Sequence, residues 1–86
     1  MPAASEVDAA LTELARQHSG RVLAILANRF GSVDLADDAV QDALVRAHDR
    51  WPHDGIPDNP PAWLMTVARR RVIDLLRRAE SAERRA

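Results

Sequence analysis

Apolar side chains recur at helical spacing in three stretches of this chain, separated by glycine, proline and small polar residues. The first stretch keeps one phase from residue 6 to residue 30. Its apolar stripe consists of Val7, Leu11, Leu14, His18, Val22 and Ile25. We predict one helix over residues 6–30, capped by Ser5 and ended by Gly31. Gly20 is a weak point that costs roughly 1 kcal/mol relative to Ala, and a break into two helices there is the alternative.

The second stretch predicts a helix over residues 34–51, which begins at the N-cap Asp34 and stops at Pro52. One side of this helix is rich in alanine and should face the core. That side consists of Ala36, Ala39, Val40, Ala43, Leu44, Ala47 and Trp51.

The third stretch follows the loop sequence PHDGIPDN and begins at Asn59, an N-cap residue, with Pro60 in the first helical position. We predict a helix over residues 60–84. Its buried side consists of Leu64, Val67, Ala68, Val72, Leu75 and Leu76. The chain carries no strand pattern and no internal repeat, so the expected fold is all-α, a compact three-helix bundle.

Composition narrows the class of protein. The 86 residues allow one small domain, and an apolar fraction of 47% is too high for a disordered chain. No cysteine is present, and no apolar run approaches the 18 or so residues of a membrane span. The N-terminus MPAASEVDAA lacks the basic start and apolar stretch of a signal peptide, so we expect a cytoplasmic protein that does not enter membranes.

Catalytic and metal-binding patterns are missing from the sequence. The three histidines, His18, His48 and His53, form neither an HExxH motif nor a ligand pair at i and i+4. His18 lies on the core stripe and is expected to be a packing residue. The glycines are 11 and 24 residues apart, which excludes a glycine-rich phosphate loop. We therefore expect no enzyme activity, no metal and no cofactor.

Charge divides the chain into two parts. Residues 1–59 carry five Arg and ten acidic side chains, whereas residues 60–86 carry seven Arg and three acidic side chains. On the middle helix, the side opposite the alanines consists of Asp38, Gln41, Asp42, Val45 and Asp49. Charge alone favours a solvated acidic face. The apolar Val45 at its centre and Gln41 one turn before it weaken that preference and indicate the alternative, a binding surface for a basic helix.

The last helix has a basic face that consists of Thr66, Arg69, Arg70, Ile73 and Arg77. Charge alone leaves DNA binding and a solvated face equally favoured. Asp74 is spaced to pair with Arg70, Arg71 and Arg78. Trp51 and Trp63 bracket the loop between the two helices, where they either anchor it to the core or support an unpaired base.

Two linked segments, DLADDAVQDALVRAHDRW and AWLMTVARRRVIDLLRR, resemble region 2 of RNA polymerase sigma factors of the extracytoplasmic-function (ECF) group. The resemblance covers roughly residues 20–78. The connecting WPHDGIPDNPPAWL is similar to a subgroup whose members often carry a long C-terminal extension. The resemblance implies a helical domain of the sigma region 2 type over residues 1–78, with residues 79–86 starting a linker toward an absent region 4.

In such proteins the middle helix docks on the clamp helices of the polymerase β′ subunit through a motif close to D-L-V-Q-E. The resemblance therefore implies that Asp38, Gln41 and Asp42 contact the polymerase, with Val45 as a neighbour. Because region 4 is absent, we expect the isolated chain to bind core polymerase weakly and promoters poorly.

The loop and last helix of the family recognise and help open the promoter −10 element, holding a flipped non-template base near the loop. The resemblance implies that the DNA-binding residues are Asp58, Asn59, Thr66, Arg69, Arg70 and Arg77. Arg70 stands where the family usually has Asn, which favours a phosphate contact over base reading. Trp63 matches a mainly structural position, and the loop lacks the aromatic residue that many members have.

The resemblance also implies an anti-sigma factor as a candidate partner. One alternative is a sigma-like interaction module that binds polymerase or an anti-sigma factor without recognising a promoter. A second alternative is a structural helical bundle that only dimerises.

Overall fold

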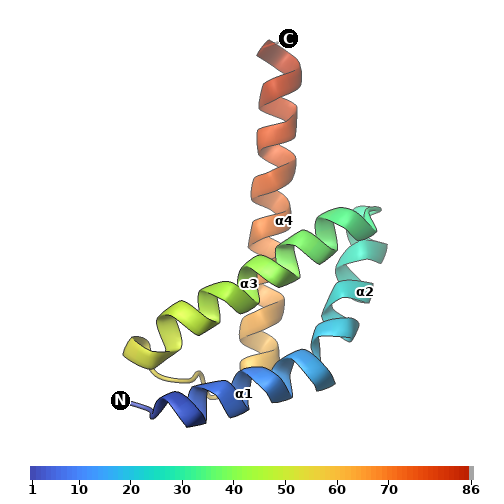
Figure 1. The fold of residues 1–86 in the computed structure, drawn as a ribbon. Coiled ribbons are helices and arrows are strands. Elements are labelled where there is room, and N and C mark those ends of the chain that lie inside the picture. The colour runs from blue at the N-terminus through green and yellow to red at the C-terminus, as the bar shows by residue number, and fades with distance from the viewer. Residues whose placement is uncertain (86) are drawn as a thin grey trace.

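The computed structural model describes residues 1–85, and these form four helices without a strand, which confirms the all-α class. The helices are α1 (Ala4–Gln17), α2 (Ser19–Phe30), α3 (Val33–Asp54) and α4 (Pro60–Arg85). Helix α3 packs against each of the other three (Figure 1). The last part of α4 extends past α3, and residues 76–85 are exposed.

The predicted single helix over residues 6–30 is wrong, because the chain turns at His18. His18 has a φ of −128°, its N–H donates to the Leu14 carbonyl at 3.0 Å, and the Ser19 hydroxyl donates to the Ala15 carbonyl. Such a side-chain bond competes with the regular helix pattern. The turn lets α1 and α2 pack separately on α3, which a straight rod of roughly 40 Å could not do (Figure 1).

The turn also changes which side of the second segment is buried. Val22 and Leu26 are in the core, whereas Ile25, expected there, is 43% exposed. His18 is half-buried, as expected for a packing residue, and Gly31 ends α2 with a φ of 74°, in the left-handed region.

Helix boundaries differ from the prediction at three points. Helix α1 begins at Ala4 after Ala3, so Ser5 is not its cap. Ser32, not Asp34, caps α3: its hydroxyl accepts a hydrogen bond from the Leu35 N–H at 3.1 Å. Helix α3 also continues past Pro52 to Asp54, because proline is compatible with helical φ and the Gly55 N–H still donates to the Trp51 carbonyl.

The core gathers along the alanine-rich side of α3. Small side chains there allow the other helices to approach closely. The buried hydrophobic residues are Val7, Leu14, Val22, Leu26, Ala36, Ala39, Val40, Ala43, Ala47, Trp51, Leu64, Ala68 and Val72. On α4 the predicted buried side is confirmed for Leu64, Ala68 and Val72, but Leu76 is 37% exposed because it lies beyond the crossing with α3.

Candidate binding surfaces on α3 and α4

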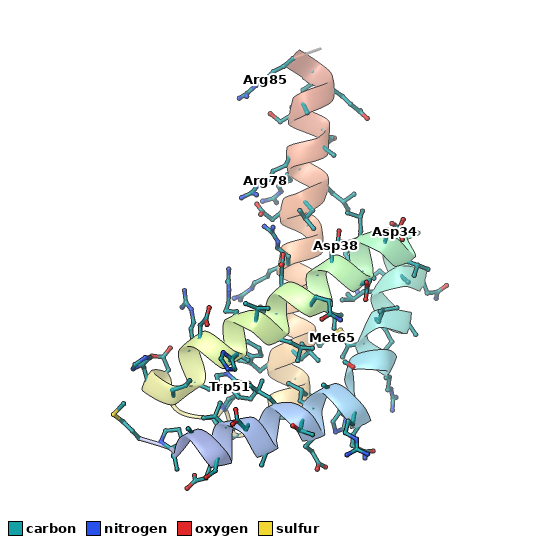
Figure 2. All side chains as sticks on the ribbon, in the orientation of Figure 1. Asp34, Asp38, Trp51, Met65, Arg78 and Arg85 are labelled. Atoms are coloured by element: carbon teal, nitrogen blue, oxygen red, sulfur yellow. The ribbon has the colours of Figure 1, made fainter. Side chains whose placement is uncertain are left out.

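The outward side of α3 has the register that the sequence predicted. Asp38, Gln41, Asp42 and Val45 are all exposed, and the Val45 side chain is 61% exposed. Asp38 lies on the half of α3 nearer α2, one turn along the helix from Asp34 (Figure 2). An apolar side chain this exposed, in the middle of an acidic face, is typical of a contact surface.

Two grooves lie on either side of Val45. The groove between α1 and α3 is shallow and open to solvent, and it is lined by Leu11, Thr12, Ala15, Gln41, Leu44, Val45 and His48. The groove between α3 and α4 is lined by Asp42, Ala43, Val45, Arg46, Asp49, Arg50, Val67, Arg70, Arg71 and Asp74. Val45 is thus a ridge between them, with Gln41 on one flank and Asp42 on the other.

An ion-pair chain crosses from α3 to α4. Arg71 Nε donates to Asp42 Oδ2 at 2.6 Å, and Arg71 Nη1 donates to Asp74 Oδ2 at 2.9 Å. Arg78 Nη2 lies 3.3 Å from the same oxygen of Asp74. The hydrogen bond that Arg71 donates to the Asp42 carboxylate raises the pKa of Arg71 above its ordinary value, although partial desolvation opposes it. One of the predicted polymerase contacts is therefore tied to the neighbouring helix.

The ion pairs between α3 and α4 correct one predicted pairing and bring Arg71 into the candidate site. Asp74 pairs with Arg71 and Arg78, as expected, but no ion pair joins it to Arg70 within the described residues. Sequence reasoning assigned Arg71 no functional role. Asp42 and Arg71 are 29 positions apart, so no local spacing could have shown that they meet.

The predicted DNA-binding residues of α4 are exposed, but they do not form one uniform face. Arg70 lines the groove between α3 and α4, together with Arg46 and Arg50. Thr66, Arg69 and Arg77 are exposed and line neither groove. The basic and acidic surfaces, which the sequence presented as separate, therefore meet at Arg70 beside Asp42 and Val45.

The loop before α4 holds the other predicted DNA-binding residues. Asp58 and Asn59 are both exposed. The Asn59 Oδ1 accepts a hydrogen bond from the Ala62 N–H at 3.2 Å, so Asn59 caps α4 as predicted. Its side-chain NH₂ makes no hydrogen bond to any residue from 1 to 85.

The two tryptophans pack on each other. Trp51 is buried at 2% exposure, Trp63 is half-buried, and their ring centroids are 5.2 Å apart in an edge-to-face arrangement. The indole N–H of Trp51 is buried without a hydrogen-bond partner among the described side chains and backbone. This geometry fits the anchoring interpretation better than a base-stacking platform.

Residues 1–85 lack the features of a metal site and of a membrane span. No group of three or more His, Cys, Asp or Glu side chains is placed to hold a metal ion. None of the described helices combines the length and apolarity that crossing a membrane requires.

Comparison with known proteins places this arrangement in a family. Residues 14–82 match the model of sigma-70 region 2. The chain is also 40% identical over 72 residues to an uncharacterized protein of Rhizobium meliloti (strain 1021). That match covers 84% of this chain and 16% of the relative, so the chain spans about a sixth of the relative's length. No solved structure matches the chain.

Proposed function

Because the chain belongs to the sigma-70 region 2 family, we propose that it binds core RNA polymerase and recognises the promoter −10 element, as region 2 of an ECF sigma factor. The residues that line both grooves lie within the matched segment, residues 14–82, except Leu11 and Thr12 on α1. The function is binding, with no catalytic step.

The observation that carries the polymerase-binding part of the proposal is the exposed Val45 ridge. Desolvating an apolar side chain at the centre of a contact is favourable, and acidic groups around it select a basic partner. Gln41 and Asp42 lie one turn before Val45 on the same side of α3 and Asp38 two turns before it, and all are exposed. We propose that this surface binds the clamp helices of the β′ subunit.

The DNA-binding part rests on the arginines of α4 and the loop before it. Arg69, Arg70 and Arg77 would contact phosphates, Thr66 would add a hydroxyl, and Asp58 and Asn59 would border the site of an extruded base. Arg46 and Arg50 lie in the same groove as Arg70, so the positive charge at that position extends onto α3.

The decisive experiment titrates core RNA polymerase with this chain and measures binding by fluorescence anisotropy. Asp38→Arg and Val45→Arg change two exposed side chains that make no ion pair within residues 1–85, so folding should be unaffected. Each should weaken binding at least tenfold. Asp37→Arg is the matched control, because Asp37 is also exposed on α3 but points about 100° around the helix axis from Asp38.

Binding that is unchanged in Asp38→Arg and Val45→Arg would remove the assignment of this face. Fluorescent non-template strands of varied −10 sequence, added to the mixture, test promoter recognition. A preference for −10 sequences supports the sigma function. Polymerase binding without any preference would instead identify an interaction module that occupies polymerase, and sedimentation of the chain alone would reveal a simple dimer.

A further inference from the structure

We propose that Arg71, on α4, is a positioning residue for polymerase binding: it holds the Asp42 carboxylate in one orientation on the α3 face, while Asp74 balances its charge. This inference rests on the proposed polymerase-binding role of Asp42 and names a residue outside that face.

The guanidinium of Arg71 is held from two sides. Its Nε donates to Asp42 at 2.6 Å and its Nη1 donates to Asp74 at 2.9 Å. The planar guanidinium fixes the directions of its donors, so two carboxylates on two helices define its orientation. The Arg71 side chain is 30% exposed, which makes it the least exposed member of the three. A group restrained in this way can act as a rigid support.

Asp42 remains available to a partner. Its side chain is 51% exposed, and its hydrogen bond to Arg71 uses only Oδ2. No bond to Oδ1 is made by any residue from 1 to 85, so that oxygen can accept a hydrogen bond from a partner's basic side chain. Asp38, also exposed on this face, has no such support within the described residues.

The charges around Arg71 decide whether it orients the Asp42 carboxylate for a partner or prevents a basic partner from binding it. A lone Arg beside Asp42 would cancel its negative charge and compete with a basic partner. Here Asp74 offsets Arg71 and is itself paired with Arg78, so the four side chains Asp42, Arg71, Asp74 and Arg78 carry no net charge together. Asp42 is therefore oriented without being overbalanced by positive charge, and its Oδ1 remains open to a donor of the partner. A carboxylate ordered beforehand loses less conformational entropy when it binds.

The test measures affinity of the full 86-residue chain for core RNA polymerase in a double-mutant cycle of Arg71→Gln and Asp42→Asn. Arg71→Gln should weaken binding by about three- to tenfold, as expected for releasing one contact side chain. In the Asp42→Asn background the same change should have less than about a twofold effect. Arg84→Gln is the control, since it removes the same charge from the exposed end of α4.

The direction of the change separates positioning from electrostatics. Removing a positive charge beside an acidic face strengthens attraction to a basic partner if Arg71 only screens or blocks Asp42. Tighter or unchanged binding by Arg71→Gln would therefore overturn the proposal. An equal loss in both backgrounds would also overturn it, because a purely structural role does not depend on Asp42.

A second variant keeps the test decisive if Arg71→Gln does not fold. Asp74→Asn leaves α3 and Arg71 in place but removes the second support and the balancing charge, so it should weaken polymerase binding as well. Wild-type affinity in Asp74→Asn would contradict the proposal. Failure of the proposed function is distinct, because Asp38→Arg and Val45→Arg would then have no effect on binding.

Discussion

The indole rings of Trp51 and Trp63 meet edge to face, with their centroids 5.2 Å apart and their planes at 69°. Trp51 lies near the C-terminal end of α3 and Trp63 in the first turn of α4. The pair therefore joins the two helices across the loop over residues 55–59, and it holds the loop that carries Asp58 and Asn59.

The tryptophan pair should contribute to stability as a unit. Edge-to-face aromatic pairs contribute about 0.5–1.5 kcal/mol beyond the area that they bury. In a urea-denaturation cycle of Trp51→Leu and Trp63→Leu, we expect a coupling in that range. Trp51→Leu should cost more than Trp63→Leu, because Trp51 is the more buried of the two. Additive effects of the two substitutions would show that the contact adds nothing.

Two glycines offer a matched pair for stability measurements. Gly31 ends α2 at a φ of 74°, so Gly31→Ala should destabilise the fold by about 1 kcal/mol. Gly20 is inside α2, and a Cβ added there meets nothing within 4 Å. Gly20→Ala should therefore stabilise the fold by about 0.5–1 kcal/mol. Thermal unfolding followed by circular dichroism measures the change in unfolding free energy for each variant. Changes of the same sign in Gly31→Ala and Gly20→Ala would contradict the two predictions.

Asn59 allows helix capping to be separated from DNA contact. Aspartate is as good an N-cap as asparagine, so Asn59→Asp should leave the unfolding free energy within about 0.5 kcal/mol of the wild type. It replaces the free amide donor with a second negative charge beside Asp58. Binding to single-stranded −10 DNA should fall, as measured by anisotropy with core polymerase present.

The comparison variant for that experiment is Asn59→Ala, which should lower stability by about 1 kcal/mol through loss of the bond to the Ala62 N–H. Wild-type DNA affinity in Asn59→Asp would confine Asn59 to its capping role.

The exposed arginines of α4 should appear in the salt dependence of DNA binding. Each phosphate neutralised on a single strand contributes about 0.7 to the slope of log K against log salt concentration. Arg69→Gln and Arg77→Gln should each reduce the slope by about that amount, whereas Arg84→Gln, near the end of α4, serves as the control. A slope that does not change would identify a solvated face. The slope is obtained by measuring the DNA-binding constant in titrations at several salt concentrations.

Local chemistry made much of this fold predictable from sequence. Gly31 ends a helix because glycine accepts the left-handed conformation, and Asn59 with Pro60 begins one because their side chains suit a first turn. The inward and outward sides of α3 follow from a period of 3.6 residues, so Val40 was expected in the core and Val45 outside it. Each of these features depends on residues within one or two turns.

The sequence by itself thus determined the helical class, the end of α2 at Gly31, the start of α4 at Pro60 and the exposed face that carries Val45. Tertiary structure decided that the chain turns at His18, where the Ser19 hydroxyl also bonds to the Ala15 carbonyl, because packing on α3 from two directions is a property of the whole core. It also decided that Arg71 reaches Asp42 and that Arg70 shares a groove with Val45. Those relationships join residues far apart in the chain, and their positions are set only where α3 and α4 cross.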